Sequence, residues 1–304
     1  MPELTPRLRV RLDRTQIDGH RDTTAFLVVE IAAPELEDNT PRPDQPLNFG
    51  LVIDASGSMA GATVDGHGDN DDSSRIEAAK RAASGIVERL EDADILSVVS
   101  FADDTLTHIA TMPMSNGGRA SAIDAIGSVH TRGCTDLNGG WLKGAEHVAR
   151  YMEEQSGARN RVLLLSDGHA NQGVVEPDLL ASTAAGLRNR GIYTSTVGIG
   201  LDYSTAQLEV LAEFGGGMMH HAEHAEDIVA VILAELNDMR TAVLDDLEVV
   251  VSQHGDDGID DSGNGSPYLD ISSIGYNSQN EAGVVTTPVG SLISGASRRV
   301  VFRL

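Results

Sequence analysis

The strongest constraint on the fold is an alternation, along the middle of the chain, of short apolar runs with amphipathic stretches of helical period. Each apolar run is short and continuous, as in a strand that is covered on both faces. One stretch between the runs carries a single apolar stripe formed by Ile76, Ala79, Ala83, Val87 and Leu90. Strands that alternate with helices over short connections form a mostly parallel sheet. We therefore expect an α/β domain over residues 47–241, a doubly wound, mostly parallel sheet flanked by helices, with strands FGLVID, DILSVVSFA, NRVLLLSDG and IYTSTVGIG.

The two ends of the chain have a different, β-rich texture. Residues 7–13 alternate apolar and charged side chains, which predicts a half-buried strand with one apolar face formed by Leu8, Val10 and Leu12. We expect residues 1–46 and 242–304 to form together a β-sandwich-like domain, into which the α/β domain is inserted. The last strand, RRVVFRL, has no polar tail after it, so the sequence leaves open whether this C-terminus is native or truncated.

Charge and composition exclude some classes of partner. The formal net charge of −24 repels phosphate backbones, so nucleic acid is not expected as a partner. The single cysteine, Cys134, cannot form an internal disulfide. The first residues lack the apolar core of a signal peptide, and no apolar stretch reaches the roughly 18 residues of a membrane span. We expect a cytoplasmic protein without a membrane span.

Oxygen-bearing side chains follow the first strand of the expected sheet. In LVIDASGSM, Asp54, Ser56 and Ser58 occupy the turn that leaves the strand. Such residues often only cap a turn. However, Thr135 in RGCTDLNGG follows a glycine turn, and Asp167 in LLLSDGHAN ends another strand. The carboxyl ends of parallel strands meet at one edge of a sheet, and hard cations such as Mg²⁺ take oxygen ligands. The pattern therefore predicts a divalent-cation site at this edge.

These residues carry a resemblance to a known family. DASGS is similar to the D-x-S-x-S motif of the von Willebrand factor type A family, and Thr135 and Asp167 match its later threonine and aspartate. The chain resembles a prokaryotic, intracellular-type member over about residues 47–241. The resemblance implies a metal-ion-dependent adhesion site formed by Asp54, Ser56, Ser58, Thr135 and Asp167. In it Thr135 binds the ion directly or through water, and Asp167 acts chiefly through water or from behind the ligands.

The resemblance also implies a function. The ion would be Mg²⁺ or Mn²⁺, with Ca²⁺ also suited, and an Asp or Glu carboxylate of a partner protein would fill its open position. This describes a metal-dependent protein-binding module without catalytic residues. One alternative is an accessory subunit of a chelatase-like complex that works with an AAA-type ATPase. A metal-dependent hydrolase is less favoured, because the chain has neither a G-x-S-x-G nucleophile turn nor a P-loop motif.

Other features invite a functional interpretation and are explained more simply. His220, His221 and His224 suggest zinc, but their segment begins as a strand and lacks a further soft ligand. Trp141 is expected in the core, and Cys134 is expected to be buried and inert. The acidic stretch 61–74 is expected to be a solvated loop. A last long helix is expected near residues 225–241.

Overall fold

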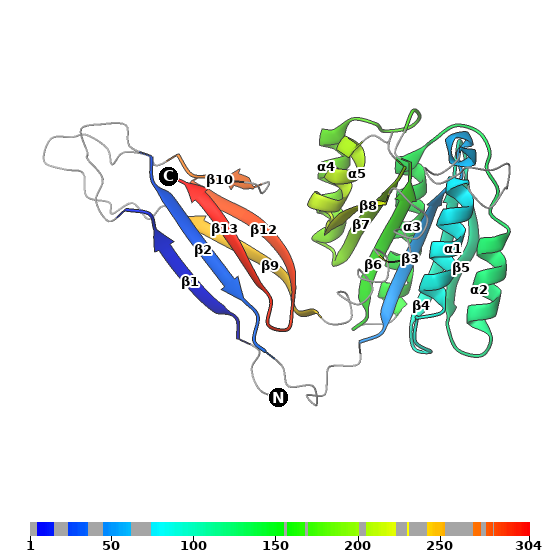
Figure 1. Cartoon of the computed structure of the whole chain (residues 1–304), viewed down its shortest axis with the longest axis horizontal. Helices are drawn as coiled ribbons and strands as arrows, with labels where there is room; N and C mark the ends of the chain where they lie inside the picture. Colours follow the sequence, from blue (N-terminus) through cyan, green and yellow to red (C-terminus); the bar gives the residue numbers. More distant parts are fainter. Residues whose placement is uncertain are drawn as a thin grey trace, which may run out of the picture. The chain divides into compact units, whose positions relative to one another are not determined.

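The computed structural model describes residues 5–14, 24–35, 45–61, 74–154, 157–167, 170–200, 205–222, 230, 242–252, 270–274, 278–281 and 283–304. The chain divides into two compact units (Figure 1). One unit contains Arg42–Asn237, and the other combines Met1–Pro41 with Asp238–Leu304. The first unit is α/β and the second is built from strands, which confirms the predicted fold class.

A six-stranded sheet forms the centre of the α/β unit, in the order β5-β4-β3-β6-β7-β8. All neighbouring pairs are parallel except β4 and β5. From β3 the chain crosses first to β4 and later to β6, so the order of strands reverses direction between β3 and β6. Ligands of such sheets bind at this reversal, beyond the carboxyl ends of the strands. The strands are β3 (Leu47–Asp54), β4 (Ile95–Phe101), β5 (Thr105–Pro113), β6 (Arg159–Ser166), β7 (Ile192–Ile199) and β8 (Gly216–Ala222).

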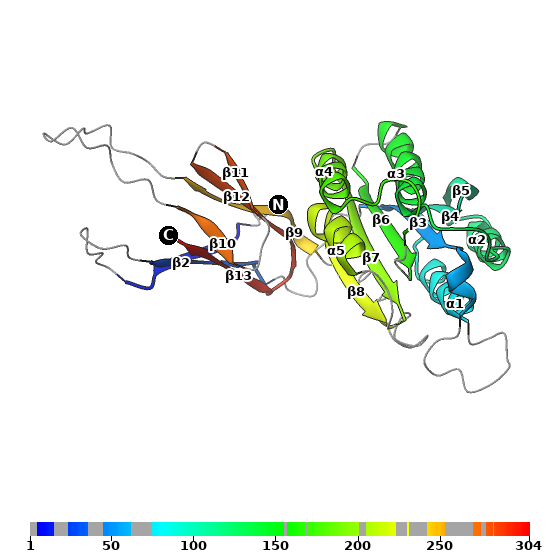
Figure 2. The same cartoon turned by 90° about the horizontal axis from the view of Figure 1, so that it is seen from above.

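Helices cover both faces of this sheet (Figure 2). The helices α3, α4 and α5 share one hydrophobic cluster with a face of the sheet, and α1 lies on the opposite face beside α2. No helix among the described residues is long and apolar enough to cross a membrane. The elements are η1 (Gly57–Ala60), α1 (Arg75–Val87), α2 (Gly118–Gly127), α3 (Leu137–Glu154), α4 (Pro177–Arg188) and α5 (Thr205–Phe214).

Local sequence explains the main elements. Every residue of β3 is buried, as expected for a continuous apolar run at the centre of a doubly covered sheet. Ser74 begins α1 by accepting a hydrogen bond from the backbone N–H of Glu77 at 3.4 Å. All residues of the predicted α1 stripe are buried. Two glycines one turn apart, Gly140 and Gly144, let α3 lie close to the sheet, since added Cβ atoms there would meet Phe101 and Val52 at 2.3 Å.

Two details of the α/β unit differ from the expectation. The sequence did not indicate β5, because this edge strand is mostly exposed and lacks the continuous apolar run used to identify the others. On α3, a buried stripe of Leu142, Ala145, Ala149 and Met152 was expected, and Leu142 is 36% exposed. Ala145 is buried, and Ala149 and Met152 pack against the same hydrophobic cluster, so the expected stripe is wrong only at its first residue. The expected helix 225–241 and the acidic stretch 62–73 lie outside the described residues, apart from the helical residue 230.

The second unit contains two antiparallel sheets, in the orders β1-β2-β13-β10 and β11-β12-β9. One hydrophobic cluster includes Val29 and Phe302 from the first sheet and Val249 and Val285 from the second. This packing confirms a sandwich-like domain made from both ends of the chain. Its strands are β1 (Arg7–Leu12), β2 (Phe26–Ala32), β9 (Ala242–Ser252), β10 (Ser272–Ile274), β11 (Gln279–Glu281), β12 (Val284–Ile293) and β13 (Ser297–Arg303).

The prediction that the first strand is half buried is wrong. All six residues of β1 are exposed, including its apolar residues Leu8, Val10 and Leu12. The strand itself and its alternation are as expected. Periodicity shows which side chains share a face, but it does not show whether a second layer covers that face.

Candidate metal centre

The first loop of the site begins at the carboxyl end of β3. Asp54 is fully buried, and its Oδ1 accepts a hydrogen bond from the backbone N–H of Ser56 at 2.8 Å. The hydroxyls of Ser56 and Ser58 lie 3.0 Å apart and form a hydrogen bond. The alternation of these residues therefore places three oxygen-bearing side chains together on one turn.

The neighbouring strand, β6, supplies a second group of oxygens. The Ser166 hydroxyl donates to Asp54 Oδ2 at 2.5 Å. Asp167 follows Ser166 and is 1% exposed. Its Oδ2 accepts a hydrogen bond from Arg75 Nη1 at 3.1 Å, whereas its Oδ1 is buried and has no partner among the residues that the structure describes. Burying a carboxylate oxygen without a partner is costly, and a bound cation is one group that would satisfy it.

Thr135 is held on a third loop, which two backbone hydrogen bonds tie to the first. The N–H of Arg132 donates to Ala55 O at 2.7 Å, and the N–H of Gly57 donates to Gly133 O at 3.2 Å. Thr135 is 3% exposed, and its N–H donates to Asn171 Oδ1 at 3.1 Å. The structure thus brings all five predicted residues to the loops at one edge of the sheet.

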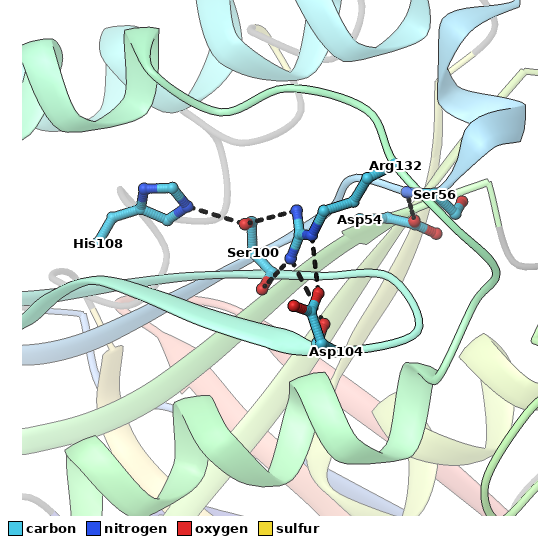
Figure 3. A network of polar contacts seen from close by, with 6 residues as sticks. All are labelled: Asp54, Ser56, Ser100, Asp104, His108 and Arg132. Carbon is cyan, nitrogen blue, oxygen red and sulfur yellow. Dashed lines mark hydrogen bonds and ion pairs between the residues drawn. The ribbon is translucent and has the colours of Figure 1, made fainter.

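Arg132 fixes the third loop through its side chain as well (Figure 3). Its Nε donates to Asp104 Oδ1 at 2.8 Å, and its Nη1 donates to Ser100 Oγ at 3.2 Å. Ser100 Oγ also lies 2.8 Å from Nε2 of His108. Burial, and to a smaller extent the Arg132 charge, lowers the pKa of His108, so the ring is neutral at neutral pH. The network joins β4, β5 and the third loop, and its one carboxylate, that of Asp104, is paired with Arg132.

Two opposing effects set the electrostatics of the site. Burial raises the pKa of Asp54 to about 6. Hydrogen bonds from Ser166 and Ser56 lower this pKa, and the charge of Asp167 raises it. A bound cation would favour the ionised form of Asp54, as would any nearby positive charge.

The residues present fit a hard divalent cation. Their side chains supply two buried carboxylates and neutral hydroxyls, with no soft ligand at the centre. Within the described part of the chain, no three His, Cys, Asp or Glu side chains gather as a potential metal site. A cation at this edge would therefore depend on the hydroxyls of Ser56, Ser58 and Thr135.

Three partners of the site were not predicted from the sequence: Arg75, Ser166 and Arg132. Ser166 directly precedes Asp167 at the end of an apolar strand, and this position was an available signal. Arg75 is the first residue of α1, and Arg132 lies on a loop. The sequence around each arginine does not indicate which carboxylate its side chain contacts.

Other predicted features have mixed outcomes. Cys134 is exposed on the loop between Gly133 and Thr135, so the expectation that it is buried is wrong. Trp141 is in the core as expected, and its Nε1–H donates to Thr194 Oγ1 at 3.0 Å. His220 and His221 belong to β8 and not to a helix, and His224 lies outside the described residues.

Comparison with known proteins agrees with this architecture. The model of the von Willebrand factor type A domain matches residues 48–233. The uncharacterized protein sll0103 of Synechocystis sp. is 29% identical over 220 residues, which are 72% of this chain and 47% of that protein. The uncharacterized protein YfbK of Escherichia coli (strain K12) is 25% identical over 205 residues, 67% of this chain and 33% of that protein. The chain thus spans less than half the length of these two relatives.

More distant similarities extend the comparison. Inter-alpha-trypsin inhibitor heavy chain H3 of Homo sapiens is 30% identical over 142 residues, 45% of this chain and 14% of the heavy chain. A solved structure, von Willebrand factor type A from Catenulispora acidiphila, aligns with a TM-score of 0.68 at 16% identity. That alignment covers 99% of this chain and 65% of the solved chain, and at such low identity it shows the fold. Because the family model covers more than half of the sequence, the chain belongs to the von Willebrand factor type A domain family.

Proposed function

We propose that the α/β unit is a protein-binding module that depends on a divalent cation held by Asp54, Ser56, Ser58, Thr135 and Asp167. One observation carries the proposal above the others. Oδ1 of Asp167 is buried and has no partner within the described part of the chain, and it lies at the edge of the sheet where the carboxylate of Asp54 is also buried. Two carboxylates in such a place are stabilised most directly by a cation.

The chemistry of the side chains suggests what the site does. Asp54 supplies the main negative charge, while the paired hydroxyls of Ser56 and Ser58 supply oxygens without charge. Arg75 already neutralises part of the charge of Asp167. These residues would leave much of the ion's charge uncompensated. A bound Mg²⁺ or Mn²⁺ would therefore supply an electrophilic position for the Asp or Glu carboxylate of a partner protein.

Calorimetric titration of Mg²⁺ and Mn²⁺ into the metal-stripped full chain tests the cation site. We expect about one equivalent to bind to the wild type and none to Asp54→Ala. Asp124→Ala is the matched control, because this aspartate is exposed on α2 and its removal changes the net charge equally. Equal titration of all three proteins would contradict the proposed site.

The open position for a carboxylate needs a separate measurement. Mn²⁺ that keeps bound waters speeds the relaxation of water protons, and a carboxylate that displaces such a water lowers this effect. We expect acetate to lower the relaxation in the Mn²⁺-loaded wild type, while chloride at equal ionic strength does not. Lack of any difference between acetate and chloride would show that no position is open to a partner.

A further inference from the structure

The strand β1 presents an apolar face that no described residue covers. In the register with β2, Leu8 lies opposite Ile31 and Val10 lies opposite Val29. Ile31 and Val29 belong to the buried core of the sandwich, so Leu8, Val10 and Leu12 point toward the same inner side. They are nevertheless 64%, 54% and 53% exposed. The four-stranded sheet thus extends past the three-stranded sheet that packs on it.

The backbone of β1 is also available for pairing. Within the described part of the chain β1 pairs with β2 alone, so it is an edge strand. The N–H of Asp13 donates to Phe26 O at 2.9 Å, and hydrogen-bonded pairs alternate along an antiparallel ladder. Arg7, Arg9 and Arg11 are therefore the residues whose backbone groups bond to β2. The backbone N–H and C=O groups of the apolar residues point to the open edge.

The opposite face of β1 is strongly basic. Arg7, Arg9 and Arg11 are all exposed, and none forms an ion pair with a described residue. On the same face of the sheet, Glu30 lies opposite Arg9 but contacts Arg299 at 3.9 Å. Three arginines in one row, without an ion pair to any described residue, contrast with a chain of net charge −24. Such a row favours a negatively charged partner.

We propose that β1 is a docking edge for an extended segment of a partner protein in which acidic and apolar residues alternate. The segment would add a strand beside β1 by hydrogen bonding to the outward backbone groups of the apolar residues. Its apolar side chains would cover Leu8, Val10 and Leu12, and its acidic side chains would face the arginines. A second copy of β1 fits poorly, because pairing it with the first would place arginines against arginines. A polyanion on the basic face would leave the apolar face exposed.

A labelled peptide in which glutamate and valine alternate tests this proposal by fluorescence anisotropy with the full chain. Its controls are a peptide of the same composition with all glutamates before all valines, and an alternating lysine–valine peptide. We expect only the alternating glutamate–valine peptide to bind the wild type. The triple variant Arg7→Glu, Arg9→Glu and Arg11→Glu should bind it at least roughly tenfold more weakly and should bind the lysine–valine peptide instead. Because only a folded variant can gain affinity for the lysine–valine peptide, this switch between peptides also excludes simple unfolding as the cause of the loss.

Two proline variants separate strand pairing from simple charge attraction. Val10→Pro removes an N–H that points to the open edge, whereas Arg9→Pro removes one that bonds to β2. We expect Val10→Pro to weaken peptide binding about tenfold while its thermal unfolding stays close to that of the wild type. Arg9→Pro should lower the unfolding temperature. Equal binding of wild type and Val10→Pro would overturn strand addition.

Three further outcomes would also overturn the proposal. Equally tight binding of the peptide with grouped glutamates would indicate that the basic face binds polyanions in general. Loss of peptide binding in EDTA or in Asp54→Ala would place the peptide at the metal centre instead. A dimer of the wild type in sedimentation that the triple variant does not form would identify a second copy as the occupant.

Discussion

Asp54 shows at the scale of one residue how burial and charge oppose each other in this protein. Burial raises its pKa from 3.8 to about 6 in the folded chain. Between these values the folded chain holds more protons than the unfolded chain, so the metal-free protein loses stability as the pH rises. We predict that Asp54→Asn has a higher unfolding temperature than the wild type at about pH 8 in EDTA, and that the difference shrinks toward about pH 4.

Saturating Mg²⁺ in about 0.5 M NaCl is the control for this prediction, because general screening is then saturated and Mg²⁺ should stabilise only the wild type, which reverses the order of the two proteins. An Asp54→Asn variant that is less stable than the wild type at every pH in EDTA would contradict the argument. Such a result would mean that the hydrogen bonds from Ser56 and Ser166 outweigh the cost of burying the charge.

Arg75 is the second residue whose charge matters to the site. Its Nη1 lies 3.1 Å from Asp167 Oδ2, and its side chain is 18% exposed. It therefore competes with a cation for this carboxylate. We predict that Arg75→Gln binds Mn²⁺ roughly three- to tenfold more tightly, a change of about 1 kcal/mol. Arg81→Gln, an exposed change of equal charge on the same helix, should alter the affinity little. Weaker binding by Arg75→Gln would show that Arg75 orients Asp167.

At the scale of an element, close approach decides where helix α3 lies and therefore where the loop that bears Thr135 ends. A Cβ atom at Gly144 would lie 2.3 Å from Cγ2 of Val52, inside the core. Gly186, on α4, is exposed and has nothing within 4 Å of an added Cβ. Both changes to alanine gain up to about 1 kcal/mol of helix propensity. Overpacking costs about 1–3 kcal/mol, so we predict that Gly144→Ala destabilises the protein while Gly186→Ala stabilises it. Denaturant unfolding measures both, and a stabilised Gly144→Ala variant would refute the steric account.

The elements also show which features a sequence can reveal. The strand β3 could be predicted because it is buried on both faces, and such a strand appears in the sequence as a continuous apolar run. The edge strand β5 was missed because it is mostly exposed and has no continuous apolar run. The burial of β1 was misjudged because no described strand covers it. The turn with Asp54, Ser56 and Ser58 was recognisable because its residues are close in the sequence. Arg75 and Asp167 are 92 positions apart, and their pairing follows from the fold alone.

At the scale of the whole molecule, the dominant property is the formal net charge of −24. Repulsion among these charges opposes the compact state, and added salt screens it within about 10 Å at 0.1 M. We predict that NaCl between about 0.01 and 0.5 M raises the unfolding temperature of the metal-free protein, mostly in the lower part of this range. An unfolding temperature that falls with NaCl over this range would mean that specific ion pairs, such as those of Arg75 and Arg132, outweigh the general repulsion.

Because of this net charge, Mg²⁺ can stabilise the protein in two ways, by general screening and by binding at the metal centre. In low salt, Mg²⁺ would stabilise any acidic chain by screening, so the wild type and Asp54→Ala should gain together. In about 0.5 M NaCl general screening is already saturated, and only binding at a defined site remains. We therefore predict that the stabilising effect of Mg²⁺ on Asp54→Ala disappears in high salt, while part of the effect on the wild type persists. If the effect on the wild type disappears as well, Mg²⁺ acts on this protein only as a counterion.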